Sequence, residues 1–364
     1  MPTVAKKTSI VRQSIGIDVS SKTLSLCFQV RDAGNKTTII STKKVDNNLA
    51  GFKEISQWIT KWLNTDVECV AVMEATGSYH ERVAYYLSDN NSQLKVSVVL
   101  ANKVKHFAKT LDNKSKTDEL DAKMLSQMGL EKNLSQWIKP DREIRFLRDL
   151  TRERAGLIQM RTRLTNELHA FENSQEVFED IILRQKEIIV FIEQKIQESE
   201  YSIKKHIKSN KIIAHSIELL TDIPGIGETT AAVLVAECDN FALFSNQRQL
   251  ASYAGLDVVH RESGTSVKGK TRISKKGNSY IRSCLYLPAL SHIRSKGIYR
   301  KNYDNIVERR GIKMVGVTAV QRKLLTLAFT LVKKNIKYNS KYSWTPTPKS
   351  KDKVTDNAIQ DISV

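Results

Sequence analysis

The first 140 residues alternate between short β-type and helical hydrophobic patterns. In QSIGIDVSSKTLSLCFQV, residues 13–30, apolar side chains alternate with small or polar ones on both sides of a turn, which predicts two adjacent strands. Further elements are predicted as a strand at 37–45, a helix at 48–63, a strand at 67–75, a helix at 80–90 and a strand at 93–100. The order β-β-β-α-β-α-β, followed by a helix that begins near Asp118, predicts a mixed α/β sheet domain with a parallel portion.

The pattern changes after residue 140. Between 141 and 206 proline is absent, Gly156 is the one glycine, and apolar side chains recur at steps of three and four. With a break near FENSQ (171–175), this pattern predicts two long helices that form an antiparallel hairpin. A plain helical connector and a dimerising coiled coil both fit it.

The remainder is expected to be mainly helical. It contains the stretch SIELLTDIPGIGETTAAVLVAEC, a basic segment, and a helical run near the end. The tail lacks periodicity and is expected to be disordered. The predicted domains are a catalytic sheet domain at 1–140, a helical hairpin at 141–210, a C-terminal domain at 211–338 and a tail at 339–364.

Charge indicates the partner. The chain has 58 Lys and Arg against 39 Asp and Glu, a net charge of +19. Residues 211–364 hold 25 basic and 12 acidic side chains, a net charge of +13, so the main docking surface for a polyanion is expected there. The N-terminus has no apolar leader and no run approaches the ~18 residues of a membrane span, which favours nucleic acid over membrane. Four scattered cysteines without a CxxC pair argue against zinc and for reduced thiols in a cytoplasmic protein.

Four acids stand at element boundaries. Asp18 ends the first strand, Glu74 ends an apolar strand, and Asp118 and Asp121 share one face of a helix at i and i+3. Two strand-end acids with a helical pair are typical of the ribonuclease H-like fold, in which carboxylates converge on two divalent ions. Hard Mg²⁺ or Mn²⁺ ions prefer oxygen ligands, and a two-metal site stabilises both the attacking and the leaving oxygen of a phosphodiester.

Each acid also has a structural interpretation. Asp18 could cap a turn with Ser20 and Ser21, and Glu74 could be a surface acid. Asp118 and Asp121 could simply favour the helix dipole behind Thr117 as N-cap. Only the joint placement of the four acids favours a metal site.

The chain resembles the IS110-family transposases, including the Piv-type DNA invertases. The resemblance runs from about residue 13 to 335 and is carried by GIDVSSKTL, MEATGSYH, NKVKHFAKTLDNKSKTDELDAKML, DIPGIGETTAAVLVAE and RQLASYAGL...ESG...ISKKGN. The motifs occur in the family's order with plausible spacing.

The resemblance implies a RuvC-like domain with a DEDD tetrad, which maps onto Asp18, Glu74, Asp118 and Asp121. It also implies a coiled coil and a C-terminal transposase domain with a serine nucleophile. Ser263 matches the family's SG pair, with Ser266 and Ser274 as alternates. Family members choose donor and target DNA with a structured bridge RNA, and the same guidance is implied here.

The residues around Ser263 suit phosphate binding. A serine hydroxyl needs a base or a metal to become a nucleophile, and basic side chains crowd this segment. The interpretation of Ser263 as an ordinary loop serine stays open. PGIG resembles a helix-hairpin-helix tip, whose backbone N–H groups approach phosphate. The predicted nucleic-acid contacts are Lys268, Lys270, Arg272, Lys275, Lys276, Arg282, Gly225 and Gly227.

Three functions compete. The leading one is a site-specific DNA recombinase of an insertion sequence, with Mg²⁺ or Mn²⁺ at the tetrad and a transient serine–DNA bond. It would act on double-stranded DNA near the prokaryotic nucleoid as a homodimer or homotetramer. A RuvC-like structure-specific endonuclease without a covalent serine intermediate is the alternative. A nucleic-acid-binding regulator is the third, and the intact acids argue against it.

Overall fold

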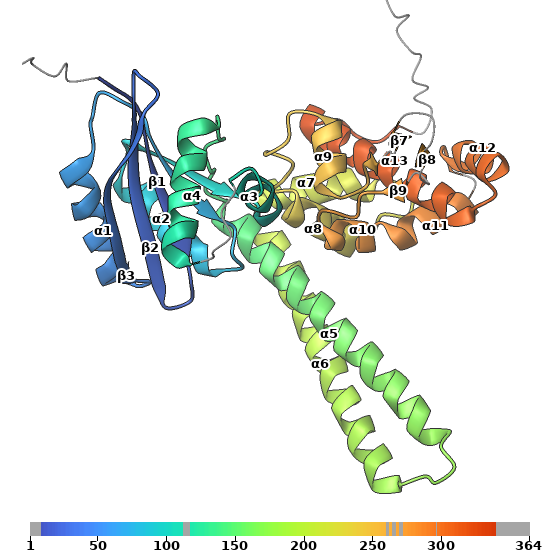
Figure 1. Cartoon of the computed structure of the whole chain (residues 1–364). Coiled ribbons are helices and arrows are strands. Elements are labelled where there is room, and N and C mark those ends of the chain that lie inside the picture. Colours follow the sequence, from blue (N-terminus) through green and yellow to red (C-terminus); the bar gives the residue numbers. More distant parts are fainter. Residues whose placement is uncertain are drawn as a thin grey trace, which may run out of the picture. The chain divides into compact units, whose positions relative to one another are not determined.

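The chain divides into two compact units, Met1–Lys139 and Pro140–Val364. Each unit is considered by itself (Figure 1). The computed structural model describes residues 9–111, 117–259, 262–263, 267–268, 272–295 and 297–339. The predicted tail therefore lies outside the described residues, apart from Asn339.

The first unit is built on a five-stranded mixed sheet. Its strands are β1 (Ile10–Val19), β2 (Thr23–Asp32), β3 (Thr37–Asp46), β4 (Cys69–Glu74) and β5 (Leu94–Val99). The order is β3-β2-β1-β4-β5, in which β1, β2 and β3 pair antiparallel and β4 lies parallel to both β1 and β5. The mixed α/β sheet predicted from the hydrophobic pattern is confirmed.

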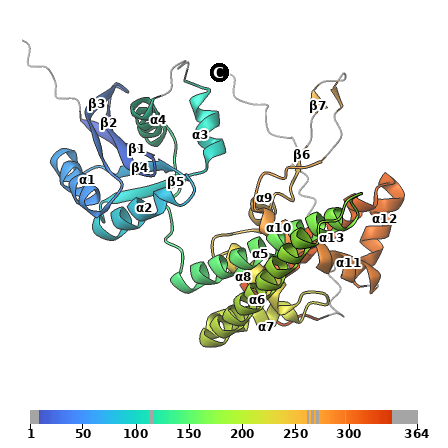
Figure 2. The same cartoon turned by 90° about the horizontal axis from the view of Figure 1, so that it is seen from below.

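Strand alternation gives the sheet two different faces (Figure 2). Ile15 and Ile17 are fully buried on the side of α1 (Leu49–Trp62) and α2 (Tyr79–Asn90), in a core shared with Phe52, Ile55 and Leu87. The intervening positions of β1 face α4 (Asp118–Glu131), whose Met124 and Leu125 pack against Val72 of β4. A short helix, α3 (Ala101–Ala108), adds Val104 and Phe107 to this second core. The side chains of β1 thus alternate between two helical layers.

Glycine permits α4 to lie directly on β1. A Cβ at Gly16 would lie well inside the contact distance of the Ala122 carbonyl oxygen and the Ser126 backbone nitrogen. Ser126 Oγ also donates to the Ser14 carbonyl at 2.9 Å. Because the obstructing atoms belong to helix backbone, no side-chain rotation would relieve a methyl group at this position.

We therefore expect Gly16→Ala to destabilise the first unit by about 3 kcal/mol or more, since an overpacked site must displace α4. Urea denaturation measures this change. The matched control is Gly156→Ala in a helix interior, where a Cβ meets nothing within 4 Å; it should stabilise by roughly 0.5–1 kcal/mol. Unchanged stability of Gly16→Ala would contradict the close seating of α4.

The second unit begins with two long helices that form a hairpin. They are α5 (Arg142–Glu172) and α6 (Glu179–Ser209). Ion pairs join Arg154 to Glu200 at 2.7 Å and Glu172 to Lys186 at 3.0 Å, and this pairing requires an antiparallel arrangement. Buried residues occur only toward the base of the hairpin, from Ile144 to Thr151 on α5 and from Ile192 to Ile207 on α6.

The remaining elements form the helical body of the second unit. They are α7 (Lys211–Thr221), α8 (Glu228–Glu237), α9 (Gln247–Tyr253), α10 (Ser279–Cys284), α11 (Tyr286–Arg294), α12 (Arg300–Arg310) and α13 (Lys313–Lys334), with the two-residue strands β6 (Val258–Val259), β7 (Glu262–Ser263), β8 (Val267–Lys268) and β9 (Arg272–Ile273). The expectation of a mainly helical C-terminal region is confirmed. Helix α13 is long and apolar enough to cross a membrane by length and composition, but half of its apolar window is buried in this protein core.

Candidate active site

The sheet register places Asp18 beside Glu74. Ile17 of β1 pairs in parallel with Met73 of β4, so the next residues, Asp18 and Glu74, lie side by side at the carboxyl ends of the two strands. Both side chains are half-buried. The turn after β1 is closed by Ser20, whose Oγ accepts from Thr23 N at 3.0 Å, so that turn is capped without Asp18.

Helix α4 brings the other two acids to the same end. It runs antiparallel to β1, because Gly129 lies over Ser14 while Ala122 and Ser126 lie over Gly16. A step of two residues along a strand (~6.6 Å) nearly matches a step of four along a helix (~6 Å). Continuing this match brings the first turn of α4, with Asp118 and Asp121, over Asp18.

The electrostatics of Asp18 agree with this geometry. Its pKa is raised from 3.8 to about 6, first by burial and then by the negative charges of Asp121, Asp118 and Glu74. Thr117 is the N-cap, with its side chain accepting from Leu120 N at 3.3 Å, so the helix-start interpretation of Asp118 and Asp121 also applies. Both roles are compatible, since a helix N-terminus favours carboxylates.

The donor set fits a hard divalent cation. Four carboxylates at one edge supply only oxygen ligands, which Mg²⁺ and Mn²⁺ prefer. Within the described part of the chain, no three His, Cys, Asp or Glu side chains converge tightly enough to be ligands as they stand. The other three acids therefore lie close enough to raise the pKa of Asp18, but the four carboxylates do not surround a common point.

The raised pKa of Asp18 makes the metal-free protein sensitive to pH. A carboxyl whose pKa rises on folding stabilises the fold at pH values below its ordinary pKa of 3.8. This contribution is lost as the pH rises through the folded-state pKa of about 6. In a chelating buffer, the melting temperature of the wild type relative to Asp18→Asn should therefore fall between about pH 4 and pH 7. Added Mg²⁺ should reverse the fall. Parallel pH profiles for the two proteins would contradict the raised pKa.

The predicted serine nucleophile lies in the second unit, on a projecting segment. Ser263 is in β7, which pairs antiparallel with β8, and β6 pairs with β9 below them. Figure 2 shows β7 farther from the helical body than β6. We call residues 258–273 the serine segment. Ser266 lies outside the described residues, and for Ser263 the description extends to the backbone only.

Backbone bonds close the base of the serine segment. Ser274 N donates to Asp257 O at 2.9 Å, Lys275 N to Gly255 O at 3.1 Å and Asn278 N to Tyr253 O at 2.7 Å. The Ser274 hydroxyl also donates to Asp257 Oδ1, so this alternate nucleophile already has a structural partner. The chain segments before and after the serine segment are therefore held next to each other where they leave the helical body.

The predicted phosphate-binding side chains divide into two groups. Arg272, Lys275 and Lys276 are exposed at the base of the serine segment, whereas Lys268 lies on β8 and Lys270 lies outside the described residues. Arg282 is different, because its Nη1 donates to the carbonyls of Ala254, Gly277 and Asn278 at 2.9, 3.1 and 3.2 Å. Arg282 thus holds the base together, a role that its charge alone did not indicate.

The PGIG turn lies between α7 and α8, as its sequence predicts. Gly225 has φ +86°, a left-handed conformation that favours glycine. Gly227 is the N-cap of α8 with φ −84°, and a Cβ there would meet nothing within 4 Å. Gly225 is needed for the turn itself, whereas Gly227 leaves the N-terminus of α8 open to an approaching group.

A charge pair with a buried carboxylate, near the base of the serine segment, was not predicted. Glu237, with a side chain only 1% exposed, pairs bidentately with Arg152 of α5 at 2.7 and 2.8 Å. Asn278 Nδ2 donates to the same carboxylate at 2.6 Å. The available signal was a single acid at the end of an apolar helical run, but its partner is 85 residues away in sequence.

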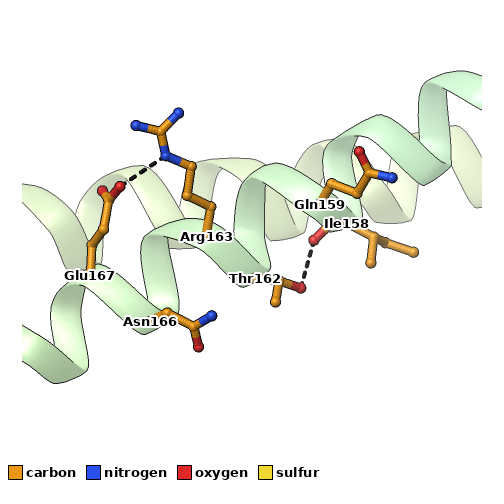
Figure 3. Close-up of a pocket in the computed structure, with 6 residues that line it drawn as sticks. All are labelled: Ile158, Gln159, Thr162, Arg163, Asn166 and Glu167. Atoms are coloured by element: carbon orange, nitrogen blue, oxygen red, sulfur yellow. Dashed lines mark hydrogen bonds and ion pairs between the residues drawn. The ribbon is translucent and has the colours of Figure 1, made fainter.

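A shallow hollow on α5 contains none of these residues (Figure 3). Its polar contacts are local to the helix: Arg163 Nε donates to Glu167 at 2.8 Å, and Thr162 Oγ1 donates to the Ile158 carbonyl at 2.9 Å. The hollow therefore offers no convergent chemistry and is not a candidate active site.

Comparisons with known proteins match both units. A family model described as a transposase (DEDD, IS110 type) matches residues 15–172, and one described as transposase of the IS116/IS110/IS902 family matches 217–304. The pilin gene-inverting protein of Moraxella bovis is 30% identical over 88% of this chain and 96% of its own length. The transposase for insertion sequence element IS1111A of Coxiella burnetii is 22% identical over 85% and 86%.

A comparison with solved structures matches part of the chain. RuvC of T. thermophilus in complex with a Holliday junction substrate is 13% identical, covering 31% of this chain and 90% of that chain, with a TM-score of 0.23. A TM-score of this size carries no argument, so the mixed-sheet assignment rests on the strand order and directions described above.

Proposed function

Because the chain belongs to the IS110 family of transposases, an enzyme family that acts on DNA, we propose that it cuts and rejoins DNA as the site-specific recombinase of an insertion sequence. The observation that carries this proposal is the meeting of Asp18, Glu74, Asp118 and Asp121 at one end of β1, β4 and α4. The relative from Moraxella bovis, named for inverting a pilin gene, supports a recombination reaction in particular.

The four acids would hold Mg²⁺ or Mn²⁺. When bound, such ions activate the attacking oxygen and stabilise the leaving oxygen of a phosphodiester. Asp18 is the central ligand in this proposal, because burial raises its pKa and the charges of the other three acids raise it further. Glu74 would supply a carboxylate from the neighbouring strand, and Asp118 and Asp121 would supply carboxylates from a helix N-terminus.

The serine segment would supply the nucleophile. Ser263 Oγ would attack the scissile phosphate, so that a serine–phosphate ester forms while the bond from phosphorus to the 3′ or 5′ oxygen breaks, and that oxygen leaves as a hydroxyl with the serine's proton. The released hydroxyl would later attack the serine ester of the recipient strand, which rejoins the DNA and frees the serine. The exposed Arg272, Lys275 and Lys276 would grip nearby phosphates, together with Lys268 and Lys270. The projection of this segment from the helical body supports its delivery to a bound strand.

Guidance and assembly belong to the same proposal. A bridge RNA would choose the donor and target DNA, and the net charge of +13 over residues 211–364 (25 basic, 12 acidic) supports binding of both polyanions. The protein would act as a homodimer or homotetramer, with the α5–α6 hairpin as a coiled coil, in the cytoplasm next to the nucleoid. Sequencing the RNA that co-purifies with the protein tests guidance, and recovery of only random cellular RNA would contradict it.

The experiment for the core proposal is strand cleavage and joining on DNA that carries the element's ends. Activity should require Mg²⁺ or Mn²⁺, disappear in EDTA and return when the ion is restored. Undiminished activity in EDTA would contradict the metal role of the acids.

A RuvC-like endonuclease without a covalent serine intermediate is the second candidate. It is favoured by one observation: all four acids lie in the first unit, so the acid cluster needs no residue of the second. In that reaction water would attack the phosphate and Ser263 would be structural. A protein–DNA adduct distinguishes the two functions.

A further inference from the structure

Lys44 of β3 lies on the same face of the sheet as the acid cluster. Asp18 pairs with Ser25 of β2, and Ser25 pairs with Lys44, so the three residues form one row across three strands. Residues paired directly in register point to the same face. Lys44 Nζ lies 3.5 Å from Asp118 Oδ2, so it also reaches the first turn of α4.

The neighbouring Lys43 points the other way. Its Nζ lies 3.0 Å from Glu54 Oε2 of α1, on the opposite side of the sheet. Two adjacent lysines of one strand thus have different environments, and only Lys44 borders the four acids. This pair offers a matched comparison within one strand.

A second lysine supplies positive charge on the same flank. Lys123 of α4 is exposed. Burial raises the pKa of the Cys27 thiol to about 11, and the positive charge of Lys123 opposes that rise. Cys27 lies two residues from Ser25 on β2, on the face that α4 covers, since its register partner is Gly16. The ammonium groups of Lys44 and Lys123 therefore both lie on the β2–β3 side of the acids.

The pairing of Lys44 with Asp118 does not explain why an ammonium stands there. Both side chains are more than half exposed, at 59% and 58%, and an ion pair of this kind contributes little to stability. A DNA strand that approaches the four carboxylates is repelled by them, because its phosphates are also negative, wherever a bound cation does not neutralise the charge. A lysine at the edge of the acids offers a flexible point charge suited to a phosphate oxygen.

We propose that Lys44, assisted by Lys123, binds a DNA backbone phosphate adjacent to the scissile one, so that the cut strand crosses the β3 side of the acid cluster. This inference rests on the proposed function and names the path of its substrate. Lys44 is a substrate-binding residue in this arrangement, and the bond it makes in the free protein, to Asp118, is exchanged for one to phosphate.

The test measures DNA binding by the full-length protein in Ca²⁺, using a fluorescent DNA duplex long enough to cover the protein. The variants are Lys44→Gln, Lys44→Arg and Lys43→Gln. Loss of one phosphate contact reduces the steepness of log affinity against log salt by about 0.9. When salt rises fourfold, the affinity of Lys44→Gln should therefore fall by a factor that is about 3.5 times smaller than the factor for the wild type. Lys44→Arg should restore the slope, and Lys43→Gln should match the wild type.

An unchanged salt slope in Lys44→Gln would overturn the proposal. If that unchanged slope comes with a shift in the Mg²⁺ concentration needed for cleavage, Lys44 is a counter-ion of the acids alone. Melting curves of the exposed-site variants verify folding. Because binding is read in Ca²⁺ without turnover, a failure of the recombinase mechanism appears separately, as persistent cleavage by Asp18→Asn.

Discussion

Asp18→Asn is expected to lower DNA strand cleavage by about 10³-fold while making the metal-free protein more stable. Loss of a ligand removes transition-state stabilisation of several kcal/mol, and ~4 kcal/mol corresponds to about 10³ in rate. The same change removes a carboxylate whose pKa is raised to about 6 by burial and by three like charges, which relieves repulsion at neutral pH. Cleavage in Mg²⁺ and melting temperature in EDTA measure the two effects.

The control is Glu119→Gln on the same helix turn. Glu119 is exposed and is not among the charges that raise the pKa of Asp18, so its neutralisation should leave cleavage within about twofold of the wild type. Equal loss of activity in both variants would mean that the acidic first turn matters through its overall charge. Full activity of Asp18→Asn would remove the acid cluster from the mechanism.

Ser263→Ala is expected to abolish the covalent protein–DNA adduct. The hydroxyl is the only functional group that the substitution removes, and an alanine at position 263 has no oxygen with which to form a phosphate ester. Residual strand cleavage should be at least about 10³-fold below the wild type, since the attacking group itself is missing. Denaturing gel electrophoresis of labelled DNA after quenching detects the adduct, and Asp18→Asn should lack it as well.

The other serines of the segment separate the remaining possibilities. If Ser266→Ala abolishes the adduct and Ser263→Ala does not, the nucleophile has been assigned to the wrong serine but the mechanism stands. Ser274→Ala should lower the stability of the fold rather than the rate of cleavage, because the Ser274 hydroxyl is hydrogen-bonded to Asp257 at the base of the segment. Metal-dependent cleavage that survives Ser263→Ala, with no adduct in any variant, would favour the RuvC-like endonuclease.

The acids of the candidate site could be predicted because each ends a regular element. Asp18 and Glu74 close strands, and strand ends of a parallel pair meet at one edge of a sheet whatever the exact register. Asp118 and Asp121 begin a helix behind a capping threonine, a pattern that marks its own position. These signals are local, so they are visible without the tertiary structure.

Roles that depend on register or distant partners could not be predicted. Lys43 and Lys44 are adjacent, so strand alternation predicts that they face opposite sides of the sheet. Only the pairing of β2 with β3 shows which of the two borders the acids. Arg282 belongs to a basic stretch, but the glycine-bearing segments beside it expose carbonyls that its guanidinium satisfies. Charge counts describe the partner of the whole protein and not the neighbour of one side chain.

The closed base of the serine segment has a consequence for divergence within the family. Residues on both sides of the segment are bonded to each other, and Asn278 joins them to the buried Glu237. Because the two ends leave from one fixed point, insertions or exchanges between them leave the packing beneath unchanged. A segment from a relative could therefore be grafted between residues 257 and 274, so that substrate preference and core stability evolve as separate traits.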